Sequence, residues 1–346
     1  METIVQIPRT DALAPADVAW LDPADLDPRD VAGVAALLQA AAEVDNPHQP
    51  ARTARTVSGR LRKGFDGQPP ATAVARDEHG RIVGVLELDL PQWDNTHVAQ
   101  LDVTVEPTGR RRGLGGRLVE IGCDRARTAG RRLVLGYAFD GTAGAEALPA
   151  LGFARVYDEV QRRQRPFALD RERLAELRRE AAARAAAYEL LRLPGVLPDD
   201  LLPAVARLAE AINDAPTDAM DIEDEALPPE RLRGREQALA AIDRRLYRLV
   251  ARERATGALA GHTVVVVDGE RPAYAYQHDT AVAPAHRGRR LGLLLKAAML
   301  DWLGEEEPQV RTIDTWNAAS NDHMVRVNEI LGYEVLATGG GWQRAL

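Results

Sequence analysis

The chain has 346 residues, of which 45% are hydrophobic and 28% charged, an ordinary globular composition, and its length suits two domains. Its net charge of −8 at pH 7 excludes a general nucleic-acid binder, which needs a basic surface, and favours a cationic or amine-bearing partner. The single cysteine excludes an intramolecular disulfide, no Cys/His spacing suits zinc, and no apolar run suits a membrane span, so we expect a cytoplasmic, metal-free protein.

The first part of the chain predicts helices and strands in alternation. In chain order the pattern predicts helices over 30–42 and 53–63, a hairpin over 71–76 and 81–90, a strand over 100–105, a helix over 113–128, a strand over 133–137, a short helix over 144–151 and closing strands over 154–160 and 163–167.

Alanines with Arg and Glu at helical spacing then predict a connecting helix over 170–191. The remaining pattern predicts helices over 199–213 and 229–246, strands over 247–253, 259–267 and 273–282, a helix over 291–303, a strand over 310–316, a short helix over 321–331 and a last strand after 339–342. We therefore expect an N-terminal domain over 1–168, a connecting helix over 169–192 and a C-terminal domain over 193–346.

A basic, glycine-rich turn occurs twice in the chain. The sequence VEPTGRRRGLGG at 105–116 returns as VAPAHRGRRLGL at 282–293, and the same offset of 177 residues relates Asp102 to Asp279. Leaving a strand and opening a helix at such a turn exposes backbone N–H groups and the positive end of the helix dipole, which together bind phosphate. The spacing differs from the P-loop and from the dinucleotide fingerprint, so neither ATP nor NAD is indicated.

Pro-x-x-Arg-x-x-Gly-x-Gly after a strand that ends in valine resembles the acetyl-CoA-binding motif of the GNAT superfamily of N-acetyltransferases. A second family signature occurs at Leu151-Gly152-Phe153 and again at Leu331-Gly332-Tyr333. The resemblance covers nearly the whole chain as a tandem pair, an arrangement also found in mycothiol synthase. It implies an α/β protein of two GNAT (acyl-CoA N-acyltransferase) domains, each a mixed, mostly antiparallel sheet flanked by helices.

The resemblance also implies which residues hold acetyl-CoA, with Val103, Val105, Thr280 and Val282 offering backbone contacts to the acyl and pantetheine groups. The expected cofactor residues are Val103, Val105, Arg110, Arg111, Arg112, Gly113, Gly115 and Gly116 in the first copy, and Thr280, Val282, Arg287, Gly288, Arg290 and Gly292 in the second. Arg290 stands where the first copy has Gly113, so we expect a narrower second turn and favour acetyl-CoA binding in the first copy.

Acetyl transfer requires a neutral amine, a donor for the oxyanion and a leaving thiolate. Asp102 and Asp279, each five residues before the proline of the turn, are the candidate bases; the alternative is that each carboxylate accepts hydrogen bonds from a nearby backbone turn and holds the fold. Alternation places His278, a further candidate, on the other face of the strand. Glu87 and Asp89 are also candidates.

The family's usual tyrosine acid is missing, because its position is occupied by Leu148 in the first copy and Asn328 in the second. Asn328 is a candidate hydrogen-bond donor to the sulfur, or a helix residue that bridges locally. The expected acceptor-binding residues are Glu223 in an acidic loop, and Trp316, Asn317 and Asn321 after the second copy's fifth strand.

We therefore expect an acetyltransferase that moves acetyl from acetyl-CoA to a primary amine of a small molecule through a ternary complex. The alternatives are a degenerate acyl-CoA-binding or sensing module, another acyl group, or a hydroxyl acceptor. No nucleic acid, metal or membrane partner is expected, and the chain suits a monomer or a homodimer.

Overall fold

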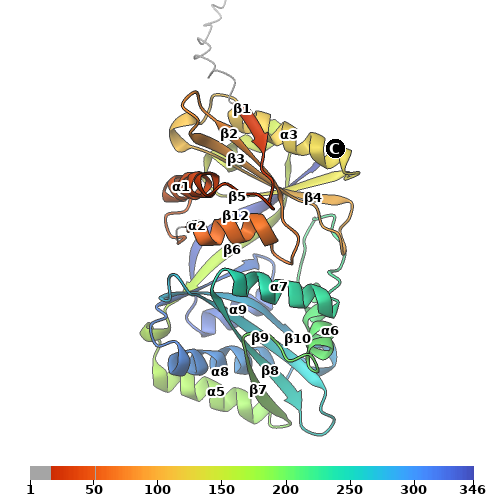
Figure 1. The fold of residues 1–346 in the computed structure, drawn as a ribbon. Helices are drawn as coiled ribbons and strands as arrows, with labels where there is room; N and C mark the ends of the chain where they lie inside the picture. The colour runs from red at the N-terminus through yellow and green to blue at the C-terminus, as the bar shows by residue number, and fades with distance from the viewer. Residues whose placement is uncertain (1–16, 51) are drawn as a thin grey trace, which may run out of the picture.

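The computed structural model describes residues 17–50 and 52–346, and within these residues twelve strands form one continuous sheet (Figure 1). The strand order is β1-β2-β3-β4-β5-β12-β6-β11-β10-β9-β8-β7. Residues 1–16 and 51 of the expected N-terminal domain lie outside the described residues. We refer to residues 17–168 as the first copy and to residues 169–346 as the second copy.

In the first copy, helices and strands alternate much as the sequence predicts. Its strands are β1 (Asp17–Trp20), β2 (Ala71–Arg76), β3 (Ile82–Asp89), β4 (Val98–Val105), β5 (Leu133–Phe139) and β6 (Ala154–Gln164). Its α-helices are α1 (Pro28–Asp45), α2 (Ala54–Lys63), α3 (Leu114–Thr128) and α4 (Ala143–Ala147).

The second copy repeats this order after an additional helix. Its strands are β7 (Tyr188–Pro194), β8 (Arg244–Glu253), β9 (Leu259–Asp268), β10 (Tyr274–Val282), β11 (Thr312–Ala318) and β12 (Glu334–Ala345). Its α-helices are α5 (Arg171–Arg184), α6 (Leu202–Ala209), α7 (Pro229–Ala241), α8 (Leu291–Glu306) and α9 (Asp322–Ile330).

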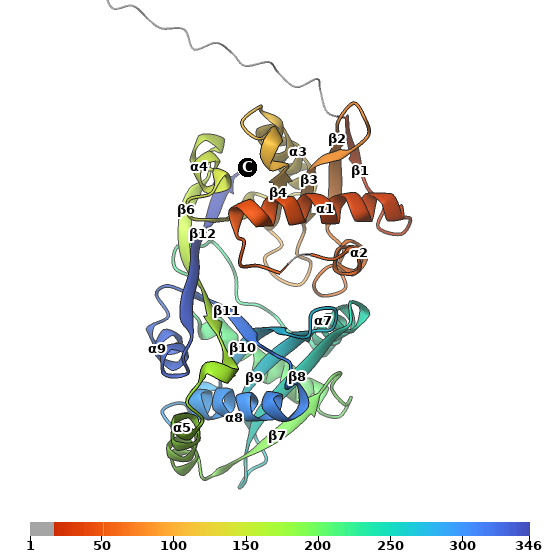
Figure 2. The same ribbon diagram turned by 90° about the vertical axis from the view of Figure 1, so that its left-hand side faces the viewer.

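The expected connecting helix over 170–191 is shorter than predicted, because α5 ends at Arg184 and the chain continues into the edge strand β7. The Asp170 side chain accepts hydrogen bonds from the N–H groups of Glu172 and Arg173 and so caps the start of α5. Helix α5 packs beside α8 on one face of the second copy (Figure 2). The segment is thus part of the second copy rather than a spacer.

The last strand of each copy is exchanged with the other copy. Strand β12 pairs antiparallel with β5, and β6 pairs antiparallel with β11. β6 and β12 also pair with each other at the centre of the sheet, where they run side by side (Figure 2). The sequence predicted that 154–167 would close the first sheet, whereas β6 joins the fifth strand of the second copy. Alternation along a strand fixes which face is buried and leaves the partner strand open.

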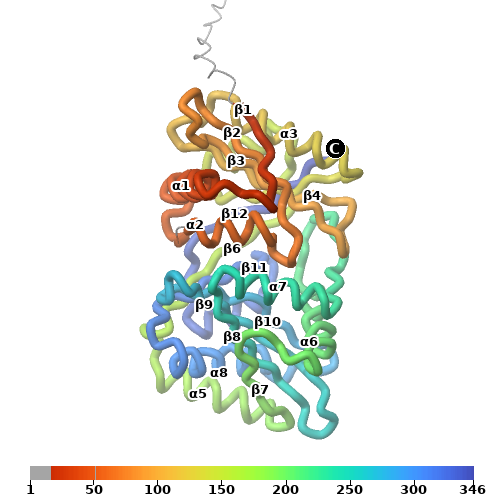
Figure 3. The backbone as a smooth tube through the Cα atoms, in the orientation of Figure 1, coloured from red at the N-terminus to blue at the C-terminus, as the bar shows by residue number. Residues whose placement is uncertain are grey.

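Helices cover both faces of the sheet in each copy (Figure 3). In the first copy, α3 packs on one face in a core that contains the fully buried Cys123, while α1 and α2 pack on the other. Burial raises the pKa of the Cys123 thiol, in keeping with a small apolar core residue. In the second copy, α8 and α5 cover the face that corresponds to α3, and α6 and α7 cover the opposite face.

The two copies also meet through α2 and α7, which cross closely at two glycines. A side chain on Gly59 would collide with Ile242, and a Cβ on Gly234 would lie 2.7 Å from the carbonyl oxygen of Asp66. Next to this crossing the buried Arg231 pairs with Asp66 at 3.0 Å and with Asp94 at 2.5 Å. The continuous sheet and this crossing hold the clefts of the two copies in a fixed relation.

Candidate active site

Both glycine-rich turns adopt the same backbone conformation. The left-handed positions are Arg111 (φ 64°) and Gly113 (φ 90°) in the first turn, and Gly288 (φ 77°) and Arg290 (φ 56°) in the second. Each turn therefore has one glycine and one arginine in this strained region, in opposite order. The Arg290 side chain forms an ion pair with Glu180 of α5, with its Nη1 3.1 Å from the carboxylate.

The first arginine of each motif braces the turn. Arg110 donates from Nε to the carbonyl oxygen of Val105 at 3.1 Å and forms a two-pronged pair with Asp45 at the end of α1. Arg287 donates in the same way to Val282 at 3.0 Å and pairs with Asp214. All three nitrogens of the half-buried Arg110 guanidinium are therefore engaged within the protein.

The segment that follows β5 packs beside the start of α3, and the turn itself, Arg111–Gly113, is exposed. Leu151 lies 3.3 Å from where a Cβ on Gly116 would be, and Arg111 pairs with Glu146 of α4. Val103 and Val105, expected to contact the cofactor, pack against the α3 core. Arg112 is exposed and has no ion pair with the residues that the structure describes.

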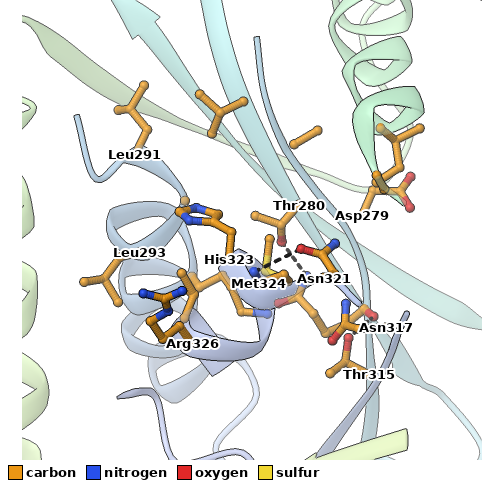
Figure 4. A pocket seen from close by; sticks show the side chains of 18 of the residues that line it. Asp279, Thr280, Leu291, Leu293, Thr315, Asn317, Asn321, His323, Met324 and Arg326 are labelled. Carbon is orange, nitrogen blue, oxygen red and sulfur yellow. Dashed lines mark hydrogen bonds between the residues drawn. The ribbon is translucent and has the colours of Figure 1, made fainter. Parts of the chain in front are cut away.

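The second turn opens into a large cavity of about 1310 Å³ (Figure 4). Pairing of the parallel strands β10 and β11 stops after Tyr276 and Asp314, and the cavity lies where the strands separate. An added Cβ on Gly292 would meet no atom within 4 Å. The cavity brings together these residues predicted from the sequence: Asp279, Thr280, Val282, Arg287, Gly288, Arg290, Gly292, Trp316, Asn317 and Asn321.

A β-bulge interrupts β10 beside this cavity. The register with β9 shifts between Gln277, opposite Val265, and Thr280, opposite Thr263. The Gln277 side chain fills the irregularity by donating to the carbonyl oxygen of Val264 at 2.8 Å and to Thr263 at 3.0 Å. In the first copy β3 and β4 pair in regular register over Gly84–Asp89 and Gln100–Val105, so only one of the two equivalent strands is bulged.

The bulge corrects the position expected for His278. Alternation would place His278 and Asp279 on opposite faces, but both line the large cavity and both also line a smaller cavity of about 170 Å³ under α6 and α7. Desolvation lowers the pKa of His278, partly offset by the nearby Asp279 carboxylate, so the imidazole is neutral at pH 7. These two residues therefore stand where the two cavities meet.

The carboxylates of Asp102 and Asp279 accept no hydrogen bond from the residues that the structure describes, which argues against their holding a backbone turn. In the first copy Asp102 lies opposite Glu87 on β3, and Arg60 of α2 pairs with Glu87 at 3.1 Å and also with Asp89. The Asp102 side chain itself is exposed. The first copy thus presents a carboxylate cluster held by one arginine.

Of the polar residues at the end of β11 and after it, Trp316, Asn317 and Asn321 line the cavity, whereas Asn328 lies behind it. Trp316 stacks on Tyr276, with ring centroids 6.1 Å apart, and the Asn321 side chain caps α9 by accepting from the N–H of Met324. Asn328 is fully buried and donates to Asn317 at 2.7 Å, so it supports a cavity-lining residue and is absent from the lining itself.

Glu223 lies away from both cavities. Its carboxylate accepts from the N–H of Asn95, and its own N–H donates to the Asn95 side chain at 2.7 Å. The acidic loop therefore joins the second copy to the loop between β3 and β4 of the first copy.

Lys296 is a cavity residue that sequence reasoning missed. It is one of two lysines in the chain, lies on α8 with 3% of its surface exposed, and has its Nζ 4.8 Å from the centre of the Tyr333 ring. Desolvation lowers its pKa to about 7. A lysine inside an apolar helix pattern was the available signal.

No helix among the described residues is long and apolar enough to cross a bilayer. In the same residues no group of three or more His, Cys, Asp or Glu side chains is arranged to hold a metal ion.

Comparison with known proteins agrees with the repeated architecture. A model described as the acetyltransferase (GNAT) family matches the chain twice, over residues 34–153 and 210–333. A tandem GNAT protein from the clavulanic acid biosynthesis pathway, solved without AcCoA, is 28% identical, with a TM-score of 0.78 over 95% of this chain and 98% of that chain. A GCN5-related N-acetyltransferase from Sphaerobacter thermophilus shares the fold at 17% identity, with a TM-score of 0.65 over 95% of each chain. No curated protein sequence matches the chain.

The family matches, the mixed sheet flanked by helices and the repeated turn all lead to one assignment. The chain belongs to the acetyltransferase (GNAT) family, as an N-acetyltransferase with two GNAT domains in tandem.

Proposed function

We propose that the chain transfers acetyl from acetyl-CoA to the primary amine of a small molecule, and that the second copy carries out this reaction. The observation that carries the proposal is the bulge at His278 and Asp279, where a large cavity beside the phosphate-type turn meets a small one beneath α6 and α7. Two substrates that enter from opposite sides would meet at this point.

The residues of the large cavity fit an acyl-CoA. Helix α8 begins at Leu291, so the N–H groups of its first turn are unpaired within the helix and suit a pyrophosphate. Open space at Gly292 admits a phosphate to the backbone. Arg287 and Arg290 form half-exposed ion pairs with Asp214 and Glu180, which are weak enough to be exchanged for phosphate contacts while Nε of Arg287 keeps its bond to Val282. Bound there, acetyl-CoA supplies an activated acyl group.

Asp279 and the neutral His278 accept the proton that the amine loses as its nitrogen bonds to the acyl carbon. The register shift interrupts the ladder between β9 and β10, which leaves backbone polar groups near Thr280 available to the acyl oxygen. Lys296 holds a proton near neutral pH and returns it to sulfur as the carbon–sulfur bond breaks, in place of the missing tyrosine. Asn328 orients Asn317 at the wall of the cavity.

The first copy has the same turn but a regular β4, so we propose that its residues Val103, Val105, Arg110, Arg111, Arg112, Gly113, Gly115 and Gly116 serve mainly to support the fold. Asp102 then belongs to the carboxylate cluster of Glu87 and Asp89 rather than to the reaction.

The test is release of free CoA from acetyl-CoA by the purified full-length chain, with a panel of amines. Saturable, amine-dependent release, together with the acetylated amine in the mass spectrum, is the expected result. Binding of acetyl-CoA without acceleration by any amine would instead support an acyl-CoA sensing module. Faster release with alcohols or with longer acyl-CoA donors would revise the acceptor or the acyl group.

A further inference from the structure

The small cavity beneath α6 and α7 is apolar on its walls and polar at one region. Its apolar wall is formed by Phe65, Val205, Ala209, Leu227, Leu232, Leu239, Leu246, Val264 and Val266. Its polar residues are Glu225, Arg235, Glu236, Arg248, His262, His278 and Asp279. Phe65 comes from the first copy, so both copies build the cavity.

Three of these polar side chains have nitrogens without a partner. His262 is 2% exposed and neither ring nitrogen makes a hydrogen bond, and the Nε groups of Arg235 and Arg248 are also unpaired. Arg248 is 3% exposed and otherwise donates to Glu236 at 2.8 Å. Buried donors without acceptors are costly, so a polar cluster of this kind in a cavity points to a ligand that supplies the acceptors.

The unpaired groups of the cavity are mainly hydrogen-bond donors, so they favour a ligand that carries acceptors. The two Nε groups carry hydrogens and are donors only, and a neutral imidazole adds one more donor and one acceptor. A carboxylate offers two oxygens with several lone pairs, and bonds from charged donors to it are the strong ones. The acidic groups Glu225 and Glu236 are already paired with arginines, whereas Asp279 remains unpaired on the side that faces the large cavity.

We propose that this cavity binds an amino carboxylate with an aliphatic side chain, with its carboxylate at His262, Arg248 and Arg235 and its amine at Asp279 and His278. The inference rests on the proposed function and names the acceptor class for the same site. The aliphatic side chain packs against the valines and leucines of the wall, and the amine loses its proton to the Asp279–His278 pair as the nitrogen–carbon bond forms.

The first copy provides an internal comparison. The repeat offset places Val85 where the second copy has His262, and Glu87 where it has Val264. The corresponding face of the first copy carries three carboxylates, Glu87, Asp89 and Asp102, beside the single Arg60, and it has no counterpart of the His262 imidazole. His262→Val therefore introduces the residue that occupies the equivalent position, Val85, in the first copy.

The experiment measures binding by calorimetry to the full-length chain, with CoA present, of a panel of aliphatic L-amino acids including L-norvaline. Each is compared with its carboxamide and with its decarboxylated amine, which for L-norvaline is butylamine. We expect at least one amino acid to bind. The affinity of the corresponding amine and carboxamide should be lower by a factor of about ten or more. In His262→Val the affinity for the amino acid should fall about tenfold, whereas that for the amine should not change.

His79→Val is the matched control, because it makes the same replacement at an exposed turn far from both cavities. Equal affinity for amino acid and amine, unchanged discrimination in His262→Val, or no binding by any member of the panel would overturn the proposal. If His262→Val fails to fold, the ligand series on the unmodified chain decides alone.

The same panel separates this inference from the proposed function. Carboxylate-dependent binding without any CoA release from acetyl-CoA supports the acceptor class and contradicts the acetyltransferase reaction. Amine-dependent CoA release that ignores the carboxylate supports the reaction and overturns the acceptor class.

Discussion

The two copies share one turn and differ in what surrounds it. In the first copy Val105 lies 3.6 Å from where a Cβ on Gly115, the equivalent of Gly292, would be, Arg111 pairs with Glu146 and strand β4 is regular. In the second copy the cavity is open at Gly292, Arg290 is tied to α5 and β10 is bulged. The comparison teaches that the glycine–arginine motif specifies the same backbone conformation in both copies. We propose that the register of the neighbouring strand, regular in β4 and bulged in β10, decides which turn serves the reaction.

Strand exchange makes each copy dependent on the other. Because β12 completes the sheet at β5 and β6 completes it at β11, residues on either strand can serve both copies. Tyr157 on β6 lines the cavity of the second copy, and the glycines at 339–341 let neighbouring side chains lie across β12, since a Cβ on Gly340 would be 2.7 Å from Nε of Arg155. The tandem chain is thus one structural unit.

Asp279→Asn should have the largest effect of the variants that distinguish the second copy from the first. Loss of a proton acceptor at the junction of the cavities should lower kcat by a factor of about 10²–10⁴, with acetyl-CoA affinity unchanged. The matched change Asp102→Asn should leave kcat within about twofold, because the first cleft lacks the bulge. Steady-state CoA release measures both, and a larger loss in Asp102→Asn would reverse our assignment of the copies.

Lys296→Met tests the lowered pKa of the buried Lys296 amine in the second copy. The Lys296 pKa is about 7 in the folded chain and 10.5 ordinarily, so the unfolded chain binds more protons between these values and the free energy of unfolding rises with pH across that window. At pH 7 the variant should be more stable than the unmodified chain, by on the order of 3 kcal/mol. Its free energy of unfolding should no longer rise with pH across this window. Urea unfolding at pH 7 and pH 9 would show it; an unchanged slope with pH would mean that Lys296 is charged in the fold.

His262→Val should remove a smaller part of the pH dependence of the free energy of unfolding, the part that falls below pH 7. The pKa of His262 is lowered to about 4 from 6.5, chiefly by desolvation, so its contribution to stability is complete above pH 6.5 and is lost as pH falls toward 4. The unmodified chain should therefore lose about 2 kcal/mol from this group between pH 7 and pH 5, and the variant should not. Urea unfolding of His79→Val at both pH values gives the reference, since its imidazole is exposed.

The sequence predicted most of the elements because their patterns are local. The hairpin of β8 and β9, strand β10 and helix α8 all follow from alternation, turn residues or apolar periodicity. The short edge strands β1 and β7 were missed; β7 is a strand only because it pairs with β8 over Tyr188–Pro194. The exchange of β6 and β12 depends on contacts between segments that are far apart in sequence, which alternation does not encode.

The candidate site was predicted in part for the same reason. The turn residues and the cluster at Trp316, Asn317 and Asn321 were visible as motifs, and the structure places them around one cavity. The bulge was not visible, so His278 was expected on the wrong face. His262 and Arg248 were missed because their importance comes from unpaired nitrogens in a cavity built by α6, α7, β8, β9 and β10 and by Phe65 of the other copy.

The most direct test of the account is the stoichiometry of acetyl-CoA binding by titration calorimetry, on the unmodified chain and on the matched variants Gly292→Glu and Gly115→Glu. The account predicts one equivalent, lost in Gly292→Glu because a charged side chain then occupies the open space at the second turn, and retained in Gly115→Glu. One equivalent that survives Gly292→Glu and disappears in Gly115→Glu would place the donor in the first copy and contradict the account.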